Sequence, residues 1–425
     1  MAITYPKVIL TLSDGSTITW EDTDIIEARL VEEMDPISAT LPMSVLDLKI
    51  FDAEDNFSVF DENEGLAERQ RIDLYEIING TEQYFGRFYL DEWENVDQQT
   101  LSLRAVDIIG VMDTTLYDGY GGGTMTVEMF VNHILADIPE TFTIEEQLIN
   151  RELRGHIQQG TVREALQQMC FASGAAVLTS RRNAIEIVVA NVPLDHNWQQ
   201  FEIGVNDKFS VQPTELLPLV TEIELTSHEY IGRGVAEIIY DEVLSPGIYK
   251  IFFKDLAELS MDRDSAYPPP DALIIENFGT GLIIEVETET EIICWGYIAD
   301  ERTRAIMFVE TSPEPFIKQN KLSVQDATLV GPKNVQDVLD RLISHYRQRY
   351  VHKFTAVVQE GPVYNEATYG EGIYGWRTSD IEVGSLVKIA TAQGAYMRSV
   401  ITKASIDLTG GFLIKFESLG VKITE

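Results

Sequence analysis

Hydrophobic and polar residues alternate with a period of two along the first quarter of the chain. This spacing is typical of β-strands with one buried and one solvated face. Seven such runs occur, at residues 7–12, 16–20, 25–33, 43–51, 71–78, 84–93 and 100–106. Asp14-Gly15 and Asn79-Gly80 stand where tight turns would join consecutive strands, because both dipeptides tolerate a positive φ. The pattern predicts an all-β N-terminal domain, a β-barrel over residues 1–116.

The period changes to that of a helix after Gly121-Gly122-Gly123, a run flexible enough to mark a boundary. Apolar residues from Val127 to Ile138 then recur at three- and four-residue spacing, which places them on one helical face. Pro139 cannot continue a helix, so it is expected to stop this one.

A second helix is expected to begin at Thr161. Glu164 follows three residues later, and this pair has the spacing of a capping box. Ser173-Gly174 is expected to end the helix. Two strands follow, at residues 176–180 and 184–190, joined by Arg181-Arg182-Asn183. Residues 117–195 are therefore predicted to form a small α/β domain.

The rest of the chain returns mainly to strands. Between residues 196 and 331 they are expected at 220–226, 236–240, 248–253, 282–286 and 291–297. Pro268-Pro269-Pro270 interrupts them and cannot join a central ladder. Asn334 is predicted to cap a third helix, and strands meeting at a Gly410-Gly411 turn follow. This gives a second β domain over 196–331 and a helix plus β domain over 332–425. The predicted class is mainly β with α/β insertions, in several domains.

Charge narrows the range of partners. The 425 residues include 69 Asp or Glu and 32 Lys or Arg, a formal net charge of −37 at pH 7. A surface this acidic repels phosphate, so we predict no sequence-specific nucleic-acid binding. No window approaches 18 consecutive apolar residues, so no membrane-spanning segment is predicted. Cys170 and Cys294 lie far apart and are expected to be buried thiols in a reducing compartment.

Motifs of catalysis are missing from the sequence. It contains no nucleophile elbow, no P-loop and no dinucleotide fingerprint. His228-Glu229 opens like a zinc-protease helix, but Gly232 stands where the second histidine ligand is needed. We therefore predict no enzyme, no cofactor and no metal site. A carboxylate-pair glycosidase remains a weaker alternative, because spacing does not reveal such a pair among 69 acidic residues.

Two acidic segments are candidate binding sites. Residues 61–65 alternate oxygen ligands, but the glycine falls fifth and Ile72 occupies the twelfth position, which excludes an EF-hand and leaves an irregular calcium loop as an alternative. In the second segment, acidic side chains alternate with Val and Thr and would share one face of an extended strand. They are Glu285, Glu287, Glu289 and Glu291. This face is a candidate acidic lining of a channel, and a water-facing sheet edge is the alternative.

Interleaved aromatic residues and glycines mark one candidate contact loop between residues 364 and 376. Aromatic rings offer contact area with few torsions to freeze, which suits an exposed binding loop. The aromatic residues are Tyr364, Tyr369, Tyr374 and Trp376. A long hairpin tip without a partner fits the same stretch equally well.

Three groups of segments resemble the baseplate hub, or tail-tip, proteins of tailed phages and related contractile particles. The first is Phe85 to Trp93 with Leu103 to Asp107, the second is the helix and hairpin from Thr161 to Ile187, and the third is Val383 to Val387 with Ile406 to Phe412. None of them is a catalytic signature. Their order along the chain carries more weight than any one of them.

The resemblance implies a homotrimer whose β-barrel domains form a ring that continues the tail tube. It also implies contacts with a tail tube or distal tail protein, a central spike or tip protein and the tape-measure protein. The protein would be made in the host cytoplasm and would end in the virion, at the tail tip or baseplate. The predicted function is structural: it joins the tube to the spike and forms part of the DNA exit channel. A host-binding adhesin of the same particle is the alternative.

Overall fold

The computed structural model describes residues 4–52, 57, 66–78, 80–97, 99–190, 201–204, 208–209, 212–253, 257–259, 272–277, 280–310, 318–357, 381–391, 394–409 and 413–423. Strands dominate, in one large sheet and several small ones, and five α-helices are found in these ranges. The predicted mainly-β, multidomain class is confirmed. The positions of the domain boundaries stay a prediction.

The N-terminal strands agree closely with the period-two runs. They are β1 (Thr4–Thr11), β2 (Thr17–Glu21), β3 (Ile25–Glu33), β4 (Val45–Phe51), β5 (Arg71–Ile78), β6 (Thr81–Asp97) and β7 (Thr100–Val106), with a short 3-10 turn η1 (Asp22–Asp24). Gly15 and Gly80 adopt φ values of 84° and 81° at the expected hairpin turns. The alternation therefore predicts correctly where these strands lie and which of their side chains are buried, because every second side chain enters one core.

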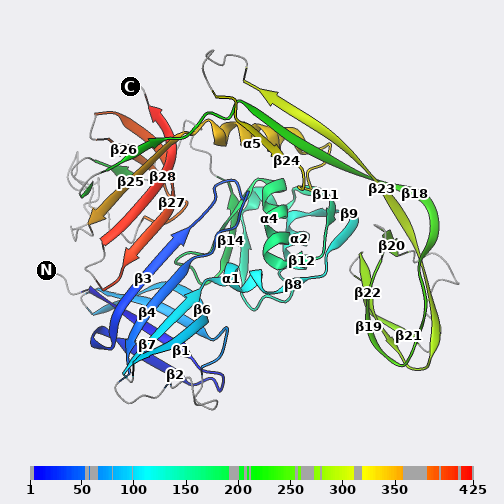
Figure 1. The fold of residues 1–425 in the computed structure, drawn as a ribbon, viewed down its shortest axis with the longest axis horizontal. Helices are drawn as coiled ribbons and strands as arrows, with labels where there is room; N and C mark the ends of the chain where they lie inside the picture. The colour runs from blue at the N-terminus through cyan, green and yellow to red at the C-terminus, as the bar shows by residue number, and fades with distance from the viewer. Residues whose placement is uncertain are drawn as a thin grey trace.

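Three short strands from the middle of the chain and four from its C-terminal part continue this same sheet. They are β15 (Phe201–Ile203), β16 (Lys208–Phe209), β17 (Thr214–Leu216), β25 (Tyr350–Val357), β26 (Leu386–Ala390), β27 (Tyr396–Asp407) and β28 (Leu413–Ile423). β27 pairs antiparallel with β3, so the blue and red strands of Figure 1 lie side by side. The sheet has 14 strands, and Leu30, Leu48, Ile406 and Phe416 belong to one buried core. Among the described strands, β2 and β16 end the pairing order without meeting, so no closed barrel forms.

The α/β unit packs beside this sheet. Its helices are α1 (Ile108–Asp113), α2 (Val127–Ile134), α3 (Glu146–Ile149) and α4 (Val162–Ser173). Its strands are β8 (Leu116–Tyr117), β9 (Tyr120–Thr126), β10 (Phe142–Ile144), β11 (Glu152–Ile157), β12 (Gly160–Thr161), β13 (Ala175–Leu178) and β14 (Ile185–Val189). The capping box of α4 is confirmed, and Gly174 ends this helix in the left-handed conformation. Cys170 lies buried on α4 as a free thiol, and Cys294 is likewise free and buried.

Three local predictions were wrong. Gly121-Gly122-Gly123 is not a flexible boundary but part of β9, which pairs with β11. The helix after it ends at Ile134, well before Pro139. Asn334 takes the N-cap position of α5 (Val335–Tyr346) as predicted, but the side-chain cap bond expected of it is absent. The Asn334 amide instead accepts from Gly331 N and donates to the carbonyl oxygens of Ala172 and Leu329.

A long two-stranded ribbon crosses the molecule above the α/β unit (Figure 1). It consists of β18 (Glu222–Leu244) and β23 (Thr290–Val309), with β24 (Lys321–Val324) and β20 (Ala257–Leu259) at its edges. The separate strands predicted at 220–226 and 236–240 are both parts of β18. The pairing register shifts between Gly232 and Ala236, and this irregularity breaks the sequence pattern.

The far end of the ribbon carries a small lobe. The lobe comprises a sheet of β19 (Gly247–Phe252), β22 (Gly281–Val286) and β21 (Ala272–Asn277), together with the adjoining ends of β18 and β23. One face of this sheet packs against the ribbon through Ile251, Leu282, Ile284 and Cys294. The lobe therefore has a core of its own.

Candidate functional site

Of the three predicted binding segments, the structure describes only the acidic one. The loop residues Tyr364, Tyr369, Tyr374 and Trp376 lie outside the described residues, and so do residues 61–65. The acidic segment is described, but it is not one extended strand. Glu285 lies in β22, Glu291 lies in β23, and the chain turns between them.

All four glutamates of this segment are nevertheless exposed. The single-strand prediction was wrong because residues 287–289 form the turn that lets β22 double back into the ribbon. The turn places Glu287 and Glu289 at the tip of the lobe, where solvent screens their repulsion. Whether this acidic surface lines a channel stays a prediction.

His228 does not form part of a metal site. Its Nδ1 lies 2.8 Å from Glu301 Oε1 and its Nε2 lies 2.8 Å from the carbonyl oxygen of Gln325. Tyr230 donates a hydrogen bond to the same Glu301 oxygen. The contact with His228 is the main cause that lowers the pKa of Glu301. These bonds fasten β18 to β23 and to the segment after β24, which is a structural role.

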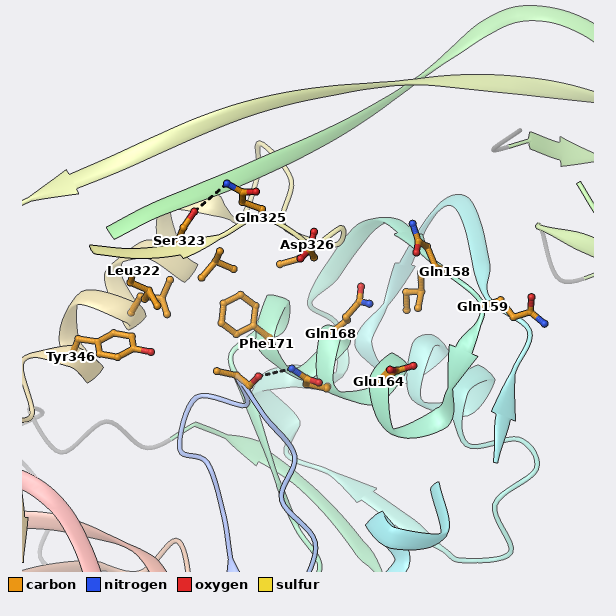
Figure 2. A pocket seen from close by; sticks show the side chains of 16 residues that line it. Gln158, Gln159, Glu164, Gln168, Phe171, Leu322, Ser323, Gln325, Asp326 and Tyr346 are labelled. Atoms are coloured by element: carbon orange, nitrogen blue, oxygen red, sulfur yellow. Dashed lines mark hydrogen bonds between the residues drawn. The ribbon is translucent and has the colours of Figure 1, made fainter. Parts of the chain in front are cut away.

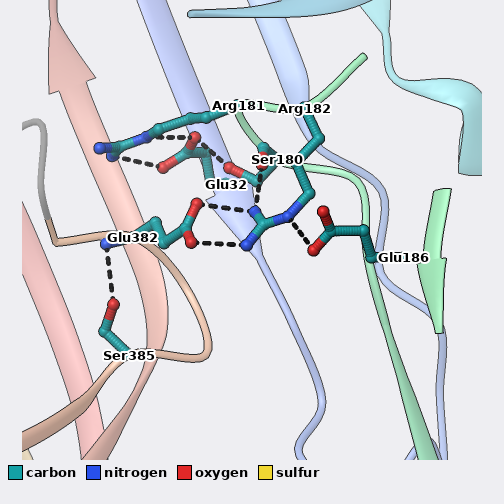
Figure 3. A network of polar contacts seen from close by, with 7 residues as sticks. All are labelled: Glu32, Ser180, Arg181, Arg182, Glu186, Glu382 and Ser385. Carbon is teal, nitrogen blue, oxygen red and sulfur yellow. Dashed lines mark hydrogen bonds and ion pairs between the residues drawn. The ribbon is translucent and has the colours of Figure 1, made fainter. Parts of the chain in front are cut away.

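The most extensive polar site is a junction between three parts of the fold (Figure 3). We call it the polar junction, and it comprises Glu32, Ser180, Arg181, Arg182, Glu186, Glu382 and Ser385. Glu32 lies on β3, residues 180–182 lie in the β13–β14 turn, and Glu382 precedes β26. The site thus joins the N-terminal strands, the α/β unit and the C-terminal strands.

Two arginines hold the polar junction together. Arg181 donates to both carboxylate oxygens of Glu32, at 3.0 and 2.8 Å, and its guanidinium lies over the Phe85 ring. The side chains of Arg181 and Glu32 are 7% and 1% exposed, so this ion pair is buried. A fork of two nearly parallel hydrogen bonds fixes orientation as well as distance. Arg181 reaches this geometry with a φ of 55°.

Arg182 points to the other side and binds Glu382 through a second fork, with distances of 2.7 and 2.6 Å. Its Nε donates to Glu186 at 2.6 Å. Burial alone would lower the pKa of Arg182, but Glu382 and Glu186 outweigh burial and raise it. The guanidinium is therefore a permanent cation that links β14 to the C-terminal strands.

A second ionic cluster joins the N-terminal sheet to the α/β unit. Arg87 on β6 contacts Asp73 on β5 at 3.1 Å and Glu140 at 2.8 Å, and Tyr89 donates to Glu140. Burial first and this hydrogen bond second raise the pKa of Tyr89. Asp107 adds a further link, because it caps α1 and accepts a 2.7 Å bond from Thr179.

Sequence reasoning treated Arg181-Arg182 only as a turn and missed both clusters. One signal was available. Two adjacent arginines stand in the turn of a chain that has more than twice as many acidic as basic residues. Arg87, Asp107, Arg181, Arg182 and Ser385 also fall within the segments that resemble tail hub proteins. These segments meet in space although they are far apart in sequence.

A cavity of about 580 Å³ lies between α4, α5, β24 and the segment after β11 (Figure 2). Its wall is rich in neutral amides, with one aromatic ring at its floor and one at its side. The labelled wall residues include Gln158, Gln159, Gln168, Phe171, Gln325, Asp326 and Tyr346. Some of these amide side chains form hydrogen bonds within the protein. Gln325, for example, donates to the Ser323 hydroxyl group at 3.2 Å.

The acidic residues of the cavity wall are Glu164 and Asp326. No histidine or lysine lines it that could activate Ser323, and its Glu164 is bound to the Thr161 backbone N–H in the helix cap. Across the residues that the structure describes, no group of three potential metal ligands gathers. No helix within those same ranges is long and apolar enough to cross a membrane.

No protein-family model and no curated protein matches this chain. Several solved structures match it. A tail protein from Neisseria meningitidis superposes with a TM-score of 0.55 at 10% identity, over 98% of this chain and 96% of its own. The chain has the tail-protein fold.

Two further structures support the assignment of this fold. The 43 kDa tail protein of prophage MuSo2 from Shewanella oneidensis has a TM-score of 0.52 at 9% identity, over 97% of this chain and 98% of its own. The prophage tail protein gp18 from Listeria monocytogenes has a TM-score of 0.50 at 10% identity, over 97% and 94%. The tail-protein fold thus spans nearly the whole chain, including the ribbon and its lobe.

Proposed function

We propose that this protein is a structural component of a phage tail, and specifically the hub that joins the tail tube to the central spike or tip. The observation that supports this proposal is the tail-protein fold shared over 97% to 98% of the chain with three tail proteins. Fold alone does not assign function. The ordered tail-hub segments in the sequence add an independent reason.

The polar junction supports a structural role. A hub must hold its parts in fixed geometry, and this chain locks three parts together with two forked arginine pairs, one buried and one partly exposed. A catalytic site would instead place titratable groups in an open cleft. The protein is not an enzyme in this proposal, and it uses no cofactor.

The proposed assembly is a homotrimer in the virion, at the tail tip or baseplate. Its partners are the tube or distal tail protein, the spike or tip protein and the tape-measure protein. The ring would enclose part of the DNA exit channel. Its net charge of −37 suits that position, because acidic walls do not hold the phosphate backbone of passing DNA.

Deletion of the gene, followed by electron microscopy of the particles, tests the proposal. A hub is needed before the tail can assemble, so the deletion is expected to yield particles without complete tails, and a plasmid copy should restore them. Complete tails that no longer adsorb to the host would indicate the adhesin instead. Complete tails that adsorb but do not degrade the cell wall would indicate the glycosidase.

A further inference from the structure

Large exposed hydrophobic side chains are concentrated on the lobe. Among the described residues, 15 such side chains are found, and seven of them lie between residues 235 and 275. They are Val235, Ile238, Val243, Ile248, Phe252, Leu273 and Ile275. Single exposed apolar residues are ordinary, but a contiguous group of them marks an interaction surface.

The strand register brings several of these side chains together on one face of the lobe sheet. Ile248 on β19 and Leu273 on β21 both pair with Glu285 on the central strand β22. These three residues therefore form one row across the outer face, opposite the face that packs on the ribbon. Ile248 is 68% exposed and Leu273 is 62% exposed. Phe252, at 41%, lies on the same face of β19.

Acidic residues accompany these apolar side chains. Glu285 stands between Ile248 and Leu273, and the exposed Glu287 and Glu289 follow in the turn at the end of the sheet. Between residues 232 and 300 the sequence has fourteen Asp or Glu and four Lys or Arg. Lys250, the lysine on the outer face of β19, is already paired with Asp118 of the α/β unit. The outer face thus carries apolar side chains on both edge strands, with one carboxylate between them and two more in the turn at the end of the sheet.

We propose that the outer face of the β19–β22–β21 sheet docks a different protein, one that presents an apolar patch flanked by lysines and arginines. Complementary charge steers such partners together, and burial of the apolar row holds them. This proposal rests on the proposed tail role in one respect: it expects the partner to be another structural protein of the same tail.

A second copy of this chain does not fit this face through its own equivalent face. Self-association through the same face would place Glu285, Glu287 and Glu289 of one copy near those of the other, and like charges in an interface repel each other. A basic partner turns the same carboxylates into favourable contacts.

Site-specific photo-crosslinking identifies the occupant. A photoreactive phenylalanine analogue at position 248 is introduced in cells that produce the particle, and cross-linked peptides are found by mass spectrometry. We expect cross-links to another tail protein, on a peptide that contains Lys or Arg. Cross-links only to another copy of this chain, or none at all, would overturn the docking surface.

Affinity measurements then test the chemistry with the identified partner. The double variant Ile248→Ser/Leu273→Ser should weaken binding by roughly tenfold or more, because it truncates the centre of the interface. The pair Glu287→Lys/Glu289→Lys should slow association and reduce its dependence on salt. Met129→Ser on α2, a side chain 52% exposed, is the matched control and should change the affinity by less than about twofold.

Two readouts separate this proposal from the tail proposal. Unchanged affinity in the Ile248/Leu273 variant would refute the docking surface even if purified tails contain the protein. Absence of the protein from purified tails would refute the tail role. The cross-linking in producing cells still decides what the lobe binds.

Discussion

At the residue scale, the buried charges of the polar junction occur as complete pairs. Glu32 is 1% exposed and its partner is the nearly buried Arg181. Removing one member of such a pair leaves a desolvated charge, which costs much more than the pair itself contributes. Each pair by itself therefore contributes little to stability, but the loss of one arginine alone is strongly destabilising.

Arg181→Met is accordingly expected to lower the free energy of unfolding by about 3–5 kcal/mol, because Glu32 stays buried without its cation. Urea denaturation measures the loss. Lys49→Met is the matched control, since it breaks an exposed pair with Glu27 and should cost at most about 1 kcal/mol. Equal losses in the two variants would contradict the role assigned to Arg181.

His352 gives a prediction about pH. It is buried on β25, accepts or donates one bond with Thr214 and stacks on Phe354. Burial, with a smaller effect of Lys208, lowers its pKa to about 4 from an ordinary value of 6.5. The unfolded chain therefore binds a proton between pH 6.5 and 4 that the folded protein does not bind, so stability must fall as pH falls through this window.

The loss should reach at most about 3 kcal/mol. His352→Gln removes the titrating group, so thermal unfolding of this variant should depend less steeply on pH between 6.5 and 4 than that of the unmodified protein. Identical slopes would show that His352 is not responsible. Both proteins should be compared at pH 7 first, to separate the pH effect from the loss of packing.

At the element scale, α4 is the helix whose ends the sequence specifies most fully. Thr161 Oγ1 accepts from Glu164 N at 3.2 Å, and Glu164 accepts from Thr161 N at 2.9 Å. Gly174 ends the helix with a φ of 73°, which a residue with a side chain adopts only with strain. Both ends follow from local chemistry.

Thr161→Ala removes the cap acceptor and is expected to cost about 1 kcal/mol of stability. Thr161→Ser keeps the hydroxyl group and should lose only a few tenths of a kcal/mol. Denaturant midpoints of the three proteins give the comparison. A melting curve of the alanine variant that matches the unmodified protein would mean that the cap is not needed.

At the scale of the whole molecule, the proposed hub makes two predictions. The first is stoichiometry. Light scattering on a tip reconstituted from this protein and its neighbours should give three copies, because closed rotational symmetry is the usual state of such parts. A stable count of two or six would contradict the trimeric hub.

The second concerns the channel wall. If the ring encloses the DNA path, its inner surface should be net negative, with acidic residues of the N-terminal strands or of the segment from Glu285 to Glu291 facing it. Mapping charge on the assembled tip checks this expectation. An inner wall that is neutral or rich in Lys and Arg would contradict it and leave the acidity to serve solubility.

The sequence predicts correctly those features that depend on interactions between residues close together in the chain. β3, β5 and β7 begin and end where the alternation predicts, and α4 where its caps predict. Each of these signals lies within a few residues of the structure that it specifies. The sequence predicts two strands where β18 is one, because a register shift interrupts its pattern. Asn334 takes the predicted N-cap position, but its amide bonds to Ala172 of a distant segment instead of capping the helix.

The sequence by itself determined the N-terminal strands, the principal helices, the strong negative charge and the order of segments that resembles tail hub proteins. Only the tertiary structure decided that β27 lies beside β3, that Arg181 and Arg182 bind carboxylates about 150 and 200 residues away, and that Ile248 and Leu273 share a face. The physical reason is separation along the chain. Local geometry sets periodicity and caps, whereas pairing between distant strands is chosen by the burial and charge balance of the whole fold.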